Sequence, residues 1–496
     1  MDLLKEYYEK FKKLDSGERE YEKCNYEFLN ENLPRFSCSV KELEEIYYFR
    51  AYTLSKHIKK NSAGKYIVTE FLNDVSWAID TEGAIACPVG HQLSELRWFK
   101  NCGEIVKQYA DFWLNHIEKL LVYNNWFCYA FYEYAEYTNC LDYAYSVADK
   151  LIEYFTLFES RNKAKCGLYK GTDNYDGMEL SISSSGIRPT INSYVYANAY
   201  GIYKILESHG DERADYYKNF CENLKKEING KLYVNDLYYN LPVEKGETID
   251  RFYPDFSNPH PDYTAKELSA YTPFYFGIPQ EENAGCLKFL TDEKIFKQKY
   301  GLATADQSNP LYKFPFPHAC LWNGPVWPFA TSQVLRGVSE WIKVHGEKEI
   351  GGSDFADMLI TYAKSQHITI EGEIRPWIDE DLDGTTGEWL ARRLIVEYGR
   401  DDVGRGKDYN HSAFIDHVIN GLCGVCVNGG KTDFKPILSD KIASFSLEGV
   451  VVGGKAYNVK YAENKYVVTE AYRELSLITT GGCPEKSAIT ASALAI

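Results

Sequence analysis

Helical periodicity runs through most of this chain of 496 residues. In the stretch 104–121, for example, Val106, Tyr109, Trp113 and Ile117 recur every three or four residues and would share one helix face. Similar patterns occur near 43–58, 127–158, 192–207, 211–227, 328–346, 354–367, 387–398 and 411–422. This pattern predicts a mainly α protein, and an (α/α)6 toroid of paired helices is an architecture that fits it.

The helical pattern stops near residue 430, and apolar residues then alternate with polar ones. Phe445 and Leu447 alternate with Ser, a Gly453–Gly454 pair follows, and Tyr457 begins a second alternating run. Such runs joined by Gly-rich turns predict a small antiparallel β appendage. We therefore expect three parts: a helical catalytic domain over 1–430, a β appendage packed on it over 431–480, and a flexible tail over 481–496.

The chain is acidic, with 55 basic and 71 acidic residues and a net charge of −16. This charge disfavours binding to nucleic acid or to an anionic membrane surface, and no apolar run is long enough for a membrane span. The N-terminus lacks the apolar core of a signal peptide. The 13 cysteines are therefore expected to be reduced thiols in a cytoplasmic protein.

Two long loops bring together carboxylates that could catalyse a reaction. The loop 167–190 contains Asp176 and Glu179, and the loop 371–389 contains Glu380 beside Trp377. Loops of this length in a compact domain usually carry function. Hydrolysis of a glycosidic bond needs two carboxyl groups across that bond, and these two loops could supply one each. Solvated loop carboxylates are the alternative interpretation.

Three further loop segments combine polar and aromatic residues, as carbohydrate-binding clefts do. Their candidate substrate-binding residues are His91, Glu95, Arg97 and Trp98 in the first, Trp322, Asn323 and Trp327 in the second, and Tyr409 and His411 in the third. A small carbohydrate is thus the expected ligand, although an isolated histidine is more often structural.

Two metal-binding patterns are incomplete. Residues 379–384 resemble the start of a calcium loop, but Leu390 stands where a bidentate Glu is needed. The pair Cys423 and Cys426 lacks a second pair for zinc. We expect neither a metal nor a cofactor, and a structural calcium ion stays an open alternative.

Taken together, and in the same order, these segments resemble motifs of the six-hairpin glycosidases. The likeness is to the mannosylglycerate hydrolase-like and glycoside hydrolase family 63-like group, whose catalytic domain is an (α/α)6 barrel, and it covers roughly residues 40–425. The segments that carry it are GHQLSELRW (90–98), DGMELS (176–181) with RPTINSY (188–194), WNGPVWP (322–328), EDLDGTTG (380–387) and YNHS (409–412).

The resemblance implies residue roles. Glu380 would be the general base, seven residues before Gly387 as the motif has it. The acid would be Glu179, although the group has an Asp at this position, so Asp176 stays a rival. Arg188, Asn192 and Tyr194 would contribute to the substrate site. The implied activity is that of an inverting, exo-acting glycoside hydrolase that removes a terminal sugar, α-glucosyl or α-mannosyl, from a small oligosaccharide or glycoside.

Three alternatives stay open. A glycoside phosphorylase on the same toroid would replace the base with a phosphate site. A sugar epimerase would use a histidine pair such as His91 and His411. A non-catalytic sugar-binding protein would bind without turnover. Neither the identity of the sugar nor the oligomeric state follows from the sequence.

Overall fold

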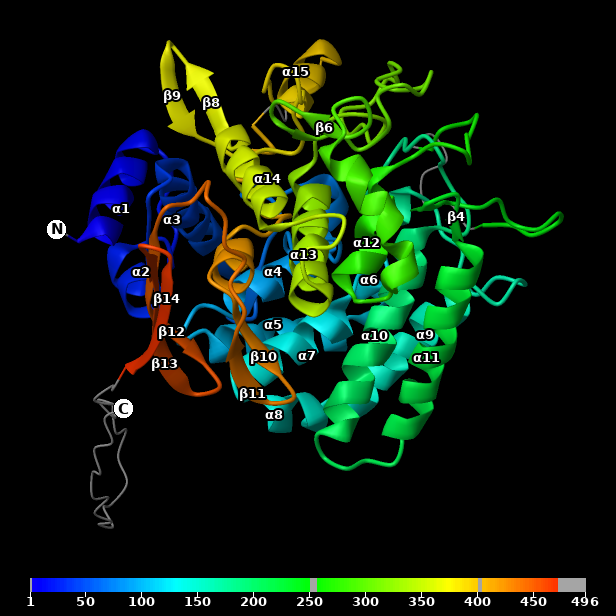
Figure 1. Cartoon of the computed structure of the whole chain (residues 1–496), viewed down its shortest axis with the longest axis horizontal. Helices are drawn as coiled ribbons and strands as arrows, with labels where there is room; N and C mark the ends of the chain where they lie inside the picture. The colour runs from blue at the N-terminus through cyan, green and yellow to red at the C-terminus, as the bar shows by residue number, and fades with distance from the viewer. Residues whose placement is uncertain (1, 250–256, 400–403, 472–496) are drawn as a thin grey trace.

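The computed structural model describes residues 2–249, 257–399 and 404–471 and is mainly α-helical, as predicted (Figure 1). The α-helices are α1 (Leu3–Leu14), α2 (Tyr26–Asn32), α3 (Lys41–His57), α4 (Val89–Leu96), α5 (Gly103–Asn115), α6 (Ile117–Leu120), α7 (Phe127–Tyr137), α8 (Leu141–Ser146), α9 (Ala148–Asn162), α10 (Pro189–Glu207), α11 (Ala214–Lys231), α12 (Thr272–Tyr275), α13 (Pro328–His345), α14 (Gly352–Ser365) and α15 (Leu390–Glu397). Short 3-10 helices are η1 (Ser76–Thr81), η2 (Asn174–Asp176), η4 (Leu268–Tyr271) and η5 (Glu281–Thr291), and η6 (His417–Leu422) is a π-helix.

The helices pack as a continuous series around the core. Helix α3 packs on α14, α14 on α13, α13 on α12, α12 on α10, α10 on α7, and α7 on α4. Helices α10 and α13 are buried over most of their length, because they lie inside this series and have apolar or small residues on nearly every face. Long loops follow or precede these helices, and the candidate site is built from those loops.

Two helical predictions differ from the structure in detail. The single stretch predicted near 127–158 is divided into α7, α8 and α9. Asn139 between α7 and α8 has φ +61°, a left-handed backbone conformation that ends a right-handed helix. The stretch predicted near 411–422 is helical only toward its end, where it forms η6.

The predicted β appendage is present. Strands β12 (Phe445–Val452), β13 (Lys455–Ala462) and β14 (Lys465–Ala471) form an antiparallel meander. Strand β1 (Arg35–Cys38), near the N-terminus, pairs with β12 and completes the sheet in the order β1-β12-β13-β14. The first and last strands of this sheet therefore come from distant parts of the sequence. The predicted tail, 481–496, lies outside the described residues.

Within the described ranges, five two-stranded hairpins accompany the helices. They are β2 (Ile58–Lys60) with β3 (Tyr66–Val68), β4 (Tyr233–Val234) with β5 (Leu237–Tyr238), β6 (Lys297–Gln298) with β7 (Gly301–Leu302), β8 (His367–Ile370) with β9 (Glu373–Pro376), and β10 (Val425–Asn428) with β11 (Lys431–Phe434). The β10–β11 hairpin begins before the boundary that we expected at residue 430.

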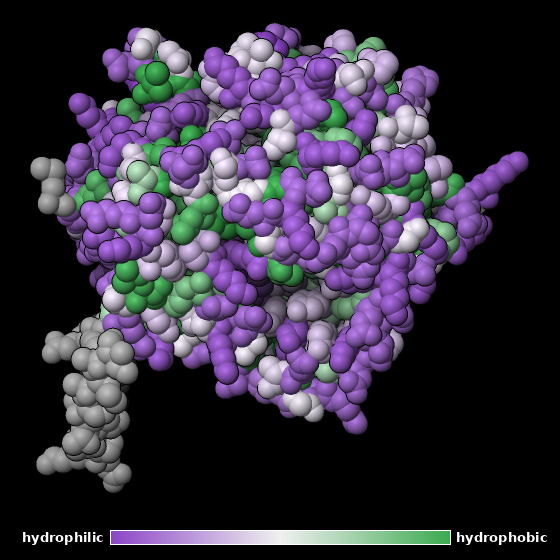
Figure 2. Space-filling view, in the orientation of Figure 1, coloured by the Kyte–Doolittle hydropathy of each residue, from purple (hydrophilic) through white to green (hydrophobic). Residues whose placement is uncertain are grey.

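The outer face in Figure 2 is mostly hydrophilic, with hydrophobic residues in small groups. Over the ranges that the structure covers, no helix combines the length and the apolar character that a bilayer crossing requires. The cysteines in these ranges are all free thiols, as the sequence predicted.

Candidate active site

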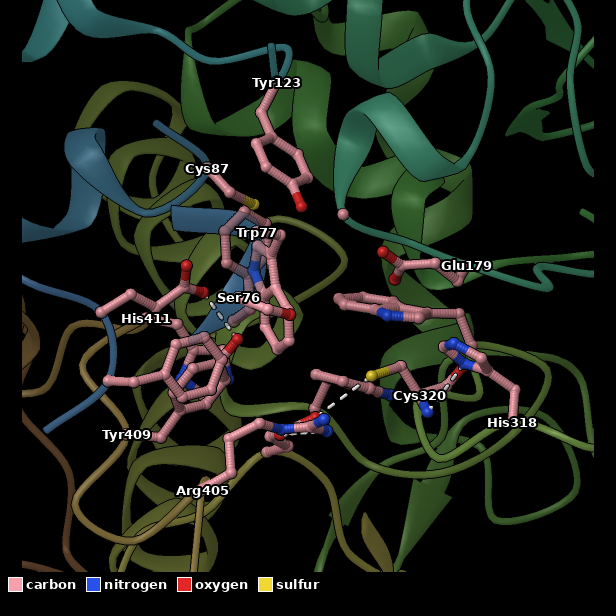
Figure 3. A pocket seen from close by; sticks show the side chains of 17 residues that line it. Ser76, Trp77, Cys87, Tyr123, Glu179, His318, Cys320, Arg405, Tyr409 and His411 are labelled. Atoms are coloured by element: carbon pink, nitrogen blue, oxygen red, sulfur yellow. Dashed lines mark hydrogen bonds and ion pairs between the residues drawn. The ribbon is translucent and has the colours of Figure 1, made fainter. Parts of the chain in front are cut away.

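A cavity of about 430 Å³ opens where the long loops meet. It contains six of the residues predicted from the sequence: Glu179, Trp322, Trp327, Glu380, Tyr409 and His411. Figure 3 shows Glu179 on one side, with Tyr409, His411 and Arg405 on the other and the Tyr123 hydroxyl directed toward the space between. The remaining lining residues are Glu70, Phe71, Ser76, Trp77, Cys87, Gly177, His318, Cys320 and Phe329.

The segment 322–326 holds the two predicted catalytic loops in place. At one end, the backbone N–H of Trp322 donates to the carbonyl oxygen of Glu179 at 3.1 Å. At the other end, Val326 and Leu382 exchange two backbone hydrogen bonds, at 2.8 and 3.0 Å. The backbone beside Glu179 and the backbone beside Glu380 are thus fixed to one short segment, which determines the separation of their side chains.

Glu179 lies on a tight turn that directs it into the cavity. Gly177, two residues earlier, has φ +68°, and a Cβ atom there would lie 2.6 Å from the Cys87 Sγ. Glycine is therefore required at 177 by both conformation and space. Burial raises the pKa of Glu179 to about 8, and the nearby carboxylates Asp173, Glu380 and Glu70 add to the rise. Glu179 consequently carries a proton at neutral pH.

Asp176, the rival acid, lies outside the cavity lining and has both carboxylate oxygens occupied. Its Oδ2 accepts hydrogen bonds from Arg188 Nε at 2.6 Å and from the Thr190 hydroxyl, and its Oδ1 accepts one from Asn124 at 2.8 Å. Asp176 and Arg188 are both buried. This pair anchors the turn before Glu179 and does not face the cavity.

Glu380 is held by a cation and a thiol. Its Oε1 accepts from Arg405 Nε at 2.8 Å and lies 2.7 Å from Arg405 Nη2. Its Oε2 accepts a hydrogen bond from the Cys320 thiol at 3.1 Å. A thiol is a weak donor, so Oε2 keeps most of its capacity to accept a proton from another group in the cavity.

The acidic residues around Glu380 do not form the calcium loop that 379–384 resembles. Asp379 pairs with Arg392 at 3.0 Å, and Asp383 pairs with Lys313 at 2.7 Å. Asp381 is fully buried, and neither of its carboxylate oxygens has a hydrogen-bond partner among the described residues. Burial and the charge of Glu380 raise its pKa far above the ordinary value.

Glu70 is a third carboxyl group of the cavity, and our sequence analysis missed it. It accepts a hydrogen bond from the Tyr409 hydroxyl at 2.6 Å, and the Tyr409 ring stacks on the His411 ring with 3.8 Å between ring centroids. Burial and the charge of Glu380 raise the pKa of Glu70 to about 8. Glu70 follows the short strand β3 and belongs to no motif, so no local signal marks it.

Aromatic rings form the rest of the cavity wall. The rings of Trp322 and Trp327 stack with centroids 4.4 Å apart, and the Trp322 indole N–H has no hydrogen-bond partner among the described residues. The Trp77 ring lies 5.6 Å from the Arg405 guanidinium and is 43% exposed. Flat rings beside unpartnered donors suit a sugar, which has both C–H faces and hydroxyls.

The other predicted residues of the first segment lie behind the cavity and have structural contacts. Glu95 accepts three backbone hydrogen bonds from residues 414–416. Arg97 pairs with Glu133 and Asp416, and the Trp98 indole donates to Asp416 at 2.9 Å. His91 is buried against Trp126 and Phe329.

Four further predicted residues also lie outside the cavity lining. Asn192 donates to the carbonyls of Tyr169 and Arg188, and Asn323 donates to backbone carbonyls of the same loop. The Tyr194 hydroxyl accepts from Gln333 at 2.7 Å. Trp377 packs under the Arg392 guanidinium at 4.9 Å.

A family model described as the mannosylglycerate hydrolase MGH1-like glycoside hydrolase domain matches residues 81–412. This range contains Glu179, Glu380 and most of the cavity lining. It confirms the resemblance that the sequence motifs indicated. No curated protein sequence matches the chain.

Solved structures agree on the fold. A protein described as a sialidase is 28% identical with a TM-score of 0.82, over 94% of this chain and 42% of that protein. A rhamnosidase of family GH78 from Bacillus sp. GL1 is 13% identical with a TM-score of 0.55, over 86% and 40%. An uncharacterised conserved protein from Thermus thermophilus is 11% identical with a TM-score of 0.51, over 71% and 99%. The chain thus spans less than half the length of the first two.

Proposed function

Because the chain belongs to the MGH1-like glycoside hydrolase family, we propose that it is an inverting, exo-acting glycoside hydrolase. Its substrate would be a small oligosaccharide or glycoside with a terminal α-glucosyl or α-mannosyl unit. The observation that carries the proposal is that Glu179 and Glu380, from distant loops, line one aromatic-walled cavity.

In this proposal Glu179 is the general acid. It must hold a proton until the glycosidic oxygen leaves, and its pKa of about 8 keeps it protonated at neutral pH. The contacts of Asp176 favour Glu179 over it, because both Asp176 oxygens are already occupied by Asn124, Arg188 and Thr190.

Glu380 is the proposed general base. Arg405 holds its Oε1 through a charge-assisted hydrogen bond, so Oε2 would take the proton from an attacking water. An inverting enzyme places this water on the face of the sugar opposite to the acid. The product would then have the anomeric configuration opposite to that of the bond cleaved.

The size of the cavity favours exo action. Its volume of about 430 Å³ lies near the small end of ligand pockets, which run from about 300 to 1,000 Å³. A cavity of this size suits the end of a sugar chain better than its interior.

Specific contacts weigh against the alternatives. A phosphorylase needs cationic groups for phosphate, but the sole lysine or arginine among the described lining residues, Arg405, is already paired with Glu380. An epimerase built on His91 and His411 would need both at the sugar, but only His411 lines the cavity. The second lining histidine, His318, has its Nδ1 held by the Cys320 backbone at 2.9 and 3.0 Å. These contacts favour hydrolysis.

Proton NMR of reactions with α- and β-linked disaccharides, with and without inorganic phosphate, tests the proposal. The expected product is a free sugar formed at a rate that does not depend on phosphate. A sugar phosphate would instead support the phosphorylase.

A further inference from the structure

Cys320 differs from other described cysteines in the group that its thiol contacts. Six of the other thiols donate to backbone carbonyl oxygens, at 3.4 to 3.9 Å. The Cys320 thiol instead donates to Oε2 of Glu380 at 3.1 Å, inside the cavity (Figure 3). A hydrogen bond to a carboxylate is stronger than one to a neutral acceptor, so this contact can fix the orientation of Glu380.

The Cys320 thiol keeps its proton at neutral pH. Burial raises its pKa well above the ordinary value, and the negative charge of Glu380 adds to the rise. The thiolate is the reactive form of a cysteine, so this side chain is not suited to act as a nucleophile. As a protonated thiol it can donate a hydrogen bond, which is the contact that it makes with Glu380.

Contacts on both oxygens fix the carboxylate plane of Glu380. The last torsion of a glutamate side chain is broad, so a carboxylate that is held at one oxygen could still turn. Arg405 holds Oε1, with its Nη2 at 2.7 Å and its Nε at 2.8 Å, and Cys320 holds Oε2. A carboxylate oxygen has about two acceptor positions. One position on Oε2 is therefore left for a water molecule.

The segment that carries Cys320 also contacts the proposed acid. The backbone N–H of Cys320 donates to His318 Nδ1 at 3.0 Å, which braces the turn before it. Two residues after Cys320, the backbone N–H of Trp322 donates to the carbonyl oxygen of Glu179 at 3.1 Å. A few residues of chain thus join the side chain of Glu380 to the backbone of Glu179. An inverting enzyme needs a set separation between its two carboxyl groups, because a water molecule must fit beside the base.

Building on the proposed glycosidase function, we infer that Cys320 is a positioning residue for the general base Glu380. Its thiol holds Oε2 in the orientation from which this oxygen takes a proton from the attacking water. Its backbone, through Trp322, keeps that oxygen at a set distance from the acid Glu179. In this role the thiol remains a hydrogen-bond donor, and no bond to sulfur forms or breaks.

Two variants of Cys320 in the full chain separate the donor from the volume of the side chain. Cys320→Ala has no donor, and it should lower kcat by about fivefold, the effect of losing one hydrogen bond. Its KM should change by less than about twofold, because the lost contact is made with the base and not with the sugar. Cys320→Ser keeps a donor and should retain kcat within about twofold of wild type.

Steady-state kinetics with an α-linked disaccharide that the wild type cleaves measure both constants. Cys140→Ala is the matched control, because Cys140 is also half-buried and its thiol donates to the carbonyl of Thr138, between α7 and α8. This control should leave kcat and KM unchanged. Thermal melting of each variant checks that it is folded.

The outcomes separate the inference from the function on which it rests. Full activity of Cys320→Ala, beside an inactive Glu380→Gln, would overturn the inference and leave the hydrolase in place. An equal loss of kcat in Cys320→Ala and Cys320→Ser would also overturn it, because packing and not donation would then matter. A raised KM with unchanged kcat would make Cys320 a substrate contact instead. Failure of the wild type to cleave any glycoside would contradict the proposed function, and the inference with it.

Discussion

Arg188 donates a hydrogen bond from Nε to Oδ2 of Asp176 at 2.6 Å, and both side chains are almost fully buried. Asp176 lies three residues before Glu179, and the family resemblance left either of them as the acid. The ion pair separates their roles, because Asp176 holds the turn together while Glu179 points into the cavity.

Because Glu179 and Asp176 differ in role, we expect different defects when each is replaced by its amide. Glu179→Gln should lower kcat by at least about 10²-fold, as loss of a general acid does, with the melting temperature little changed. Asp176→Asn should retain more activity but lose about 3–5 kcal/mol of stability, because it leaves the buried Arg188 without its charge partner. Steady-state kinetics and urea unfolding measure both effects, and the reverse order of activities would move the acid to Asp176.

The pH dependence of turnover follows from the raised pKa of Glu179. The acid must be protonated in the free enzyme, so kcat/KM should fall above pH 8, by roughly tenfold per pH unit. Glu70 has a similar pKa and could produce the same limb. Glu70→Gln distinguishes the two, because the fall above pH 8 should persist in this variant if Glu179 is the acid. Its disappearance would assign the limb to Glu70.

Asp381 should cost the protein stability at neutral pH. Its pKa is raised in the folded state, so the proton is held more tightly there than in the unfolded chain. The stability that Asp381 contributes is therefore greatest below about pH 4, the pKa of an aspartate in the unfolded chain. This contribution is lost as the pH rises toward the pKa of Asp381 in the folded protein. Asp381→Asn mimics the protonated form and should add about 1–3 kcal/mol at pH 7, with little change at pH 4. Urea unfolding at both pH values checks this, and equal effects at the two would contradict it.

Chelators should leave the melting temperature unchanged. The carboxylates of Asp379 and Asp383 are paired with Arg392 and Lys313, so the loop that resembles a calcium site has its charges satisfied without an ion. Differential scanning calorimetry with and without EDTA measures the effect. A fall of several degrees, reversed by added calcium, would restore the calcium-loop interpretation.

The helices could be predicted because their signal is local. The apolar spacing of Val106, Tyr109 and Trp113 is set within one helix, and these residues are buried in α5. The sheet was predicted in part, because the alternation in β12 to β14 is also local. Its pairing with β1 was not predicted, since that contact joins opposite ends of the chain.

The cavity could be predicted only where a motif marks it. Glu380 and Trp322 lie in such motifs, whereas Glu70 is joined to Tyr409 across 339 positions without any motif of its own. The polar–aromatic pattern also selected Arg97 and Trp98, which the structure places in a buried ion network with Asp416. Sequence spacing cannot distinguish a charge that binds a ligand from one that binds another buried charge.

The central claim is that Glu179 and Glu380 cleave a glycosidic bond with inversion. Proton NMR of the initial product, from wild type and from Glu380→Gln, tests it most directly. We predict that the released sugar appears first as the anomer opposite to the linkage cleaved, and that Glu380→Gln shows no turnover although it still binds sugar. A product that retains the configuration, or a Glu380→Gln variant as active as wild type, would contradict the account.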